Sequence, residues 1–191
     1  MIRLTSFFVA ALLLTSCART VSRVNPDQQI DLSGRWNDSD SRMVAQKMIN
    51  DFLNSDKFKD YSKVLNKKPS IIVGLIRNKT SEHIDADNYI KKFELAIYNS
   101  GVADLVESDS FRDKLRQERA EQQDFASSNT ASKWGMEQGA NLMLFGEMTS
   151  ETDTYNNKRV VNYVTTLFLT DIETNKRIWY GQDEIKKYIK N

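Results

Sequence analysis

The sequence predicts a single α/β domain built on a mixed sheet of four to five strands flanked by helices. Three observations predict this class. Apolar residues recur at helical spacing in several separated segments, other segments are short and apolar or β-branched as strands are, and helices alternate with strands before three strands follow in succession. The chain has 191 residues, of which 40% are hydrophobic, so it can bury one core. We expect this domain to occupy residues 35–191.

The first sixteen residues read as a signal peptide. Arg3 is their only charge, and the eleven mostly apolar residues 4–14 are too few to cross a bilayer, which takes about 20 helical residues. Residues 14–17, Leu-Thr-Ser-Cys, resemble the bacterial lipobox, so we expect cleavage between Ser16 and Cys17 and acylation of the Cys17 thiol. The alternative is an uncleaved amphipathic start with a buried free cysteine.

An acylated Cys17 would attach the protein to a membrane. Each buried acyl methylene contributes about 0.8 kcal/mol, so two or three chains hold a protein there permanently. Ala18 follows the cysteine in place of the Asp that retains lipoproteins at the inner membrane, which favours a periplasm-facing location at the outer membrane. Residues 17–34 have no hydrophobic period, and we interpret them as a lipidated tether that reaches about 60 Å at most.

Each element in the first half of the domain has a local signal. Residues 37–41 are helix-capping side chains, and the apolar residues after them are three and four apart, which predicts a helix to about Asn54. A lysine-rich stretch follows at 56–68. The continuous apolar run at 71–76 predicts a central strand buried on both faces.

Helices and strands continue to alternate in the middle of the chain. Helical spacing predicts a helix over 85–100 that ends before Gly101, and a short strand follows at 102–107. The highly charged stretch 111–125 predicts a solvated helix. We expect another helix over residues 130–138, with Trp134 pointing inward.

Three strands complete the predicted domain. They cover 142–148, 160–169 and 177–181, and the turn-forming residues 171–175 join the last two in a hairpin. The segment 152–158 is expected to be an Asn- and Thr-rich connection, and the lysine-rich tail 186–190 has no evident role in the core.

Composition excludes several functional classes. Without the first sixteen residues, 26 Lys and Arg face 26 Asp and Glu, so no cationic face for nucleic acid is expected. One cysteine forbids an intramolecular disulfide, and one histidine leaves little for a metal. His83 lies in a polar loop among sequence neighbours, whereas acid–base chemistry needs groups converging from separate elements. We predict no catalytic residues, no metal and no cofactor.

Several stretches resemble the penicillin-binding protein activator LpoB family of outer-membrane lipoproteins, whose domain is similar to the TolB amino-terminal type. These stretches are residues 32–42, 72–80, 96–101, 135–146 and 169–181, and the resemblance covers about residues 32 to 182. It implies a non-enzymatic activator that binds a bifunctional penicillin-binding protein and stimulates glycan polymerisation and peptide crosslinking in peptidoglycan synthesis. Well-known members carry a long Pro-rich tether, whereas this one is short and has one proline.

Other functions remain open at this point. A secretion-channel lipoprotein related to the curli exporter would need pairs of amphipathic membrane strands of about 9 to 11 residues. Only residues 160–170 have that length and character. Another periplasmic interaction module, or an enzyme that acts on cell-wall sugars through paired carboxylates, is a further alternative. For partner binding we single out Tyr155 and Arg159, whose residue types are enriched in interface hot spots, and we expect a monomer.

Overall fold

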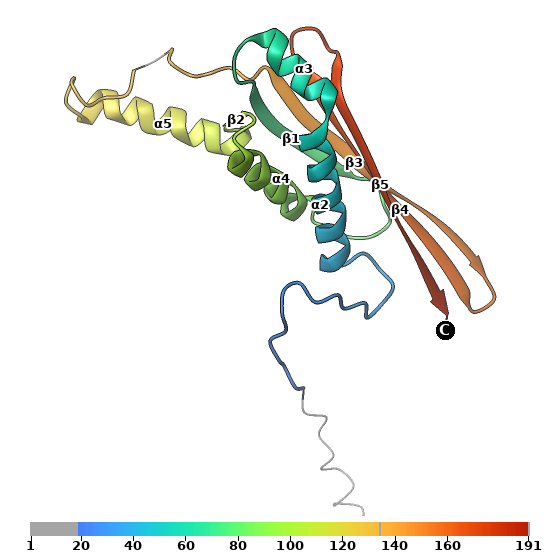
Figure 1. Ribbon diagram of the computed structural model, residues 1–191. Helices are drawn as coiled ribbons and strands as arrows, with labels where there is room; N and C mark the ends of the chain where they lie inside the picture. The colour runs from blue at the N-terminus through green and yellow to red at the C-terminus, as the bar shows by residue number, and fades with distance from the viewer. Residues whose placement is uncertain (1–18, 134, 191) are drawn as a thin grey trace, which may run out of the picture.

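The fold is an open five-stranded mixed sheet with helices packed on one of its faces (Figure 1). The computed structural model describes residues 19–133 and 135–190. The elements in chain order are α2 (Asp38–Asn54), α3 (Asp56–Leu65), β1 (Ser70–Asn78), α4 (Ala86–Ser100), β2 (Asp104–Val106), α5 (Asp109–Phe125), β3 (Leu142–Tyr155), β4 (Lys158–Asp171) and β5 (Arg177–Lys190). This confirms the predicted fold class.

The strands lie in the order β2-β1-β3-β4-β5. β1 pairs in parallel with β2 and β3, whereas β3–β4 and β4–β5 are antiparallel. β2 and β5 are therefore the two edges of the sheet. Since β3, β4 and β5 have 14 residues each and β2 has three, the sheet extends well beyond the helices at one end (Figure 1).

Local signals explain where the helices begin and end. The Asn37 side chain accepts a hydrogen bond from the backbone N–H of Asp40 (3.2 Å), and the Asp40 carboxylate accepts one from the N–H of Asn37 (2.9 Å). This reciprocal capping box fixes the start of α2. α4 ends at Gly101, whose φ of 66° lies in the left-handed region that glycine adopts without steric cost. Both helix ends agree with the sequence prediction.

The core lies between the helices and one face of the sheet. It is formed by the apolar faces of α2 and α4, Phe58 of α3, and every second residue of the longer strands, with Trp179 almost completely buried. Backbone packing at Gly146 is close, because a Cβ there would lie 2.1 Å from the carbonyl oxygen of Thr166. Glycine is thus required where β3 and β4 approach each other.

Polar contacts align the helices with the sheet. The Trp179 Nε1–H donates to the Asp51 carboxylate of α2 (2.9 Å), and Lys47 of α2 pairs with Asp183 of β5. The Tyr61 hydroxyl of α3 donates to Asp171 (2.7 Å); burial and this bond raise the pKa of Tyr61 to about 12. These contacts give α2 and α3 a defined position over β4 and β5.

Two sequence predictions about burial and helix content are wrong. The run 71–76 is buried on one face only, and Leu75 keeps 64% of its surface exposed, because α5 extends away from the sheet and does not cover the second face (Figure 1). Residues 130–133 and 135–138 form no helix. Gly135 has a φ of 73°, which a right-handed helix cannot contain. Trp134 lies outside the described residues.

Two further predictions underestimate the strands. The expected connection 152–158 is almost entirely strand, since β3 runs to Tyr155, β4 starts at Lys158, and only Asn156 and Asn157 form the turn. The tail 186–190 is the second half of the ladder that β5 forms with β4. Pairing with β4 decides the conformation of both segments, and most of their polar side chains face solvent, whereas Lys187 points to the helix-covered face.

Candidate interaction surfaces

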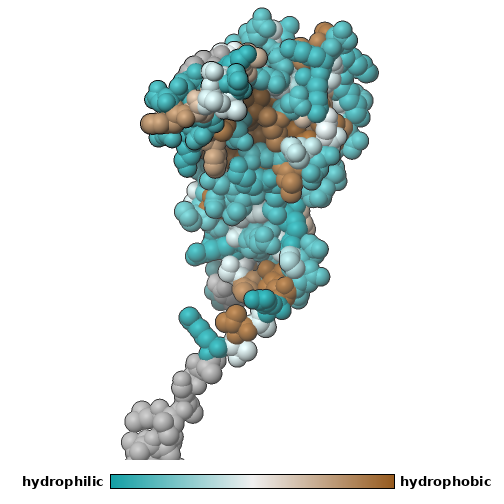
Figure 2. All heavy atoms as spheres, turned by 90° about the vertical axis from the view of Figure 1, so that its left-hand side faces the viewer, coloured by the Kyte–Doolittle hydropathy of each residue, from teal (hydrophilic) through white to brown (hydrophobic). Residues whose placement is uncertain are grey.

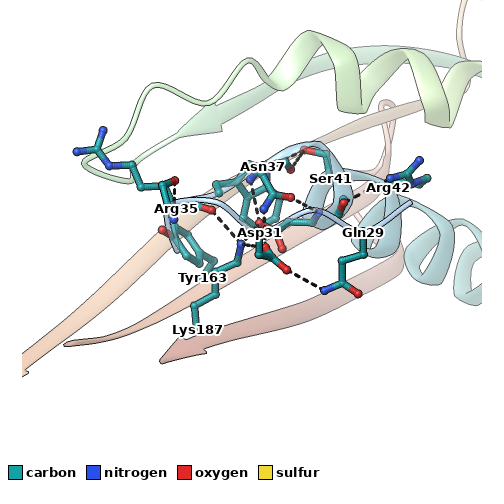
Figure 3. Close-up of polar contacts among 12 residues, drawn as sticks. Gln29, Asp31, Arg35, Asn37, Ser41, Arg42, Tyr163 and Lys187 are labelled. Atoms are coloured by element: carbon teal, nitrogen blue, oxygen red, sulfur yellow. Dashed lines mark hydrogen bonds and ion pairs between the residues drawn. The ribbon is translucent and has the colours of Figure 1, made fainter. Parts of the chain in front are cut away.

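Lys187, near the C-terminal end of β5, binds the segment that precedes α2 (Figure 3). The Lys187 ammonium lies 2.6 Å from an oxygen of Asp40 and 2.9 Å from an oxygen of Asp31, and it donates to the Arg35 carbonyl (2.9 Å). Asp40 is 2% exposed and the Lys187 side chain 11%. Three acceptors on α2 and the preceding chain therefore converge on one buried ammonium.

Two members of this cluster, Lys187 and Asp31, have shifted pKa values. Burial disfavours the Lys187 ammonium more than any other single cause, yet the hydrogen bonds and charges of Asp40 and Asp31 together outweigh it, so the pKa of Lys187 is raised. Hydrogen bonds from Lys187, Gln29 and Asn37 lower the pKa of Asp31 to about 2. Both shifts favour the charged forms, the Lys187 ammonium and the Asp31 carboxylate.

A second set of contacts holds Trp36 beside β4. The Glu82 carboxylate accepts from the Trp36 backbone N–H (3.0 Å) and from the Tyr163 hydroxyl (2.7 Å). The two aromatic rings meet edge to face with centroids 5.4 Å apart. Burial first, and then the bond to Glu82, raise the pKa of Tyr163. Together with the Lys187 cluster, these contacts hold residues 31–37 against the extended end of the sheet.

The second face of the sheet carries a row of aromatic side chains that no helix or strand of the described residues covers. Phe145, Phe168 and Tyr180 are direct neighbours on β3, β4 and β5, with ring centroids 5.6 and 5.4 Å apart. The Arg177 guanidinium stacks 4.0 Å from the Phe168 ring centre. Tyr180 is 50% exposed and Met143, on the same face, 37%. We call Met143, Phe145, Phe168, Arg177 and Tyr180 the aromatic row.

The aromatic row has the composition of a protein-binding surface. Aromatic residues, Met and Arg are enriched in interfaces, and Arg177 has no carboxylate partner among the residues the structure describes. The neighbouring rings are inclined by 61° and 47°, so they do not offer the common plane that stacking on a flat ligand needs. The opposite side, seen in Figure 2, is mostly hydrophilic, with brown side chains in small separate groups.

The structure does not bring the predicted pair Tyr155 and Arg159 together. Tyr155 is directly opposite Lys158 and Arg159 is opposite Thr154, so the two side chains point to opposite faces of the β3–β4 hairpin. Tyr155 is 76% exposed, whereas Arg159 is partly buried on the face of Tyr163. Their role in partner binding stays a prediction. The predicted cleavage and lipidation sites, Ser16 and Cys17, lie outside the described residues.

The lone histidine lies on a shallow depression. His83 is exposed and, together with side chains of α2 and α4, lines a surface hollow of about 520 Å³. Within residues 19–133 and 135–190, no three His, Cys, Asp or Glu side chains gather where they could hold a metal ion. No helix in this part of the chain is long and apolar enough to cross a membrane.

Sequence reasoning missed both the Lys187 cluster and the aromatic row. Lys187 belonged to a tail with no apparent role, and the apolar residues in and next to that tail, Ile185, Tyr188 and Ile189, do not alternate with polar ones as a strand signal requires. Phe145 and Phe168 lie in strands that were predicted, but their meeting depends on strand order and register, which the sequence does not reveal.

Comparison with known proteins identifies the family. A family model described as the peptidoglycan-synthase activator LpoB matches residues 40–185. Among solved structures, the chain is similar to the LpoB C-terminal domain from Salmonella enterica, with 16% identity, a TM-score of 0.43, and coverage of 76% of this chain and 98% of that chain. The LpoB C-terminal domain from Escherichia coli has 17% identity and a TM-score of 0.41, and the match covers 80% of this chain and 99% of that chain. Lipoprotein GNA1162 from Neisseria meningitidis has 14% identity and a TM-score of 0.37, and the match covers 63% of this chain and 83% of that chain.

A comparison with curated protein sequences gives no match. The family model, by contrast, extends from the capping box of α2 to the middle of β5 and so includes every strand of the sheet. Because this match covers well over half of its length, the chain belongs to the peptidoglycan-synthase activator LpoB family.

Proposed function

We propose that this protein is a lipid-anchored, periplasm-facing outer-membrane lipoprotein that binds a bifunctional penicillin-binding protein and stimulates its synthesis of peptidoglycan. The observation that carries the proposal is the family match over residues 40–185. The lipobox that ends at Cys17 supports the anchor. In this proposal the protein performs no chemistry itself and acts by binding.

The short tether limits where the partner can be. Because residues 31–37 are held against the sheet by Lys187 and Glu82, only the chain from Cys17 to about Ile30 is left to span distance. Fully extended, these residues reach about 45 Å. The proposed synthase must therefore present its docking domain close to the outer membrane.

We propose the aromatic row as the surface that contacts the synthase. It combines exposed aromatic area with a guanidinium that has no acidic partner among the described residues, so a matching surface would offer an apolar side chain next to a carboxylate. The competing surface is the hairpin tip with Tyr155 and Arg159.

A reconstituted synthase assay tests the proposal. Detergent-solubilised full-length protein is added to each bifunctional penicillin-binding protein of the source bacterium, and glycan polymerisation and crosslinking of lipid-linked precursor are followed. We expect both rates to rise with the concentration of the protein until binding saturates. Unchanged rates with every synthase at saturating protein would reject the activator role.

Surface variants then decide between the two candidate surfaces. The double variant Arg177→Ala/Tyr180→Ala should raise the protein concentration needed for half-maximal stimulation at least tenfold. The double variant Tyr155→Ala/Arg159→Ala tests the competing surface. Thermal unfolding midpoints confirm that each variant is folded. If only the hairpin variant loses stimulation, the aromatic row is not the contact surface.

The anchor is tested separately. Mass spectrometry of the membrane-extracted protein should show a mature chain that begins at an acylated Cys17, and Cys17→Ser should release the protein from the membrane fraction. An unmodified thiol on the mature chain would contradict the lipid anchor without affecting the binding assay.

A further inference from the structure

β5 is a long edge strand with a free outer side. It contributes 14 residues to the sheet and pairs only with β4. Within residues 19–133 and 135–190, no backbone group of another element bonds to its outer edge. An exposed edge of this length is a template for pairing with another strand.

The neighbouring segment leaves the backbone of this edge free. Residues 31–35 reach β5 through the Lys187 side chain, and Gly34 lies against the Ile189 side chain; both side chains point to the helix-covered face of the sheet. These contacts fix side chains on one face and use no main-chain donor or acceptor of β5.

The charges of β5 are arranged so that the strand complements itself. Asp183 and Glu184 precede Ile185, and Lys186 and Lys187 follow it. When two copies of this strand run antiparallel about Ile185, each Glu184 faces a Lys186 and each Asp183 faces a Lys187. Opposite charges at directly facing positions stabilise antiparallel pairs, and like charges destabilise them.

Symmetry restricts the possible registers, and the charged centre of β5, residues 183–187, distinguishes among them. An antiparallel pair of identical strands in one sheet has its two-fold axis perpendicular to the sheet, so the axis passes through a pair of equivalent residues. Axes through Asp183, Glu184, Lys186 or Lys187 place two like charges directly opposite each other. The axis through Ile185 gives four opposite-charge pairs and no like-charge pair.

We propose that the outer edge of β5 binds β5 of a second copy of this chain, antiparallel and with the two-fold axis at Ile185, which gives a dimer with one continuous ten-stranded sheet. Residues 180–190 of each copy form the ladder. Tyr180 faces Lys190 of the second copy, Gly181 faces Ile189 and Gln182 faces Tyr188, so no two like charges meet in this part of the ladder. This arrangement replaces the monomer expected from the sequence and does not depend on the proposed function.

Glu184 and Lys186 are the charged residues that contribute most to the choice of partner and register. Asp183 and Lys187 already have partners in their own chain, namely Lys47 and the pair Asp31 and Asp40. Glu184 and Lys186 lie on the uncovered face, exposed to solvent; Glu184 accepts hydrogen bonds from the Asn162 and Gln182 amides (3.3 and 3.2 Å), and no ion pair within the described residues engages either side chain. Substitutions at these two positions can therefore change dimerisation without disturbing the core.

Disulfide trapping tests the register. Directly opposite residues in an antiparallel pair have Cα atoms about 4.5 to 5.5 Å apart, which suits a disulfide. Full-length Ile185→Cys in detergent should form a covalent dimer under mild oxidation. Gln182→Cys alone should not, but a mixture of Gln182→Cys and Tyr188→Cys should. The parent chain, with Cys17 as its only cysteine, is the background control.

Charge exchange tests the pairing itself. By sedimentation in detergent, Glu184→Lys and Lys186→Glu should each raise the dimer dissociation constant about tenfold or more, because two attractive pairs become repulsive. The double variant, and an equimolar mixture of the two single variants, should both recover dimers. Glu151→Lys, which makes the same charge change on exposed β3, should leave dimerisation unchanged.

Two results would overturn the proposal. One is a monomer at all concentrations with no covalent dimer from Ile185→Cys. The other is a dimer whose stability is unaffected by either single charge variant, which would place the contact elsewhere. Dimerisation that depends on β5 while synthase stimulation is absent would leave this inference standing and reject only the proposed function.

Discussion

Removal of the Lys187 ammonium should strongly destabilise the fold, although Lys187 lies near the end of an edge strand, where most substitutions cost little. In Lys187→Met, the apolar stem remains and the three acceptors of the ammonium lose their donor. Asp40, which is 2% exposed, then keeps a buried carboxylate with only the backbone N–H of Asn37 as a strong partner. Breaking a buried ion pair in this way costs about 3–5 kcal/mol. Because Asn37 still donates, we expect a loss of about 3 kcal/mol.

Urea unfolding of the full-length protein measures this loss. The matched control is Lys158→Met, an exposed lysine at the start of β4, which should change the free energy of unfolding by less than about 0.5 kcal/mol. Adding Asp40→Asn to Lys187→Met removes the unpaired charge but keeps the capping oxygen, so the double variant should regain about 1–2 kcal/mol.

Either of two results would contradict a structural role of the Lys187 ammonium. A loss below about 1 kcal/mol for Lys187→Met would mean that water replaces the ammonium at Asp40 without penalty. A double variant no more stable than Lys187→Met would mean that the unpaired Asp40 charge is not the cause of the loss.

Two further variants test other parts of the structure. Gly146→Ala should cost about 2 kcal/mol or more by thermal unfolding, because its Cβ would overlap the Thr166 carbonyl, whereas Gly139→Ala, with no atom within 4 Å, should be neutral. Since the folded-state pKa of Asp31 is about 2, below its usual 3.8, its stabilising effect is complete above pH 4 and lost as the pH falls toward 2. Asp31→Asn should therefore reduce the acid sensitivity of the unfolding midpoint in that interval, and an unchanged pH profile would show that Lys187 does not need this partner.

The helices α2, α4 and α5 and most strands followed from the sequence because their signals are local, whereas α3 lies in a stretch for which no helix was predicted. Asn37 and Asp40 bond across three residues, and the apolar face of α2 repeats within each turn, so the start of that helix needs no knowledge of the rest of the chain. Gly101 ends α4 for an equally local reason. The helix expected over residues 130–138 is absent from the described residues of that stretch, where Gly135 adopts a φ of 73° that no right-handed helix contains.

The sequence by itself determined the fold class, the order of most elements and the resemblance to the LpoB family, because periodicity, capping and motif stretches are properties of neighbouring residues. The tertiary structure alone decided which face of the sheet is uncovered, that Phe145, Phe168 and Tyr180 form one row, and that Lys187 holds the chain before α2. Strand order and register bring these residues together from distant positions, and a one-residue slip in register would send every side chain of a strand to the other face.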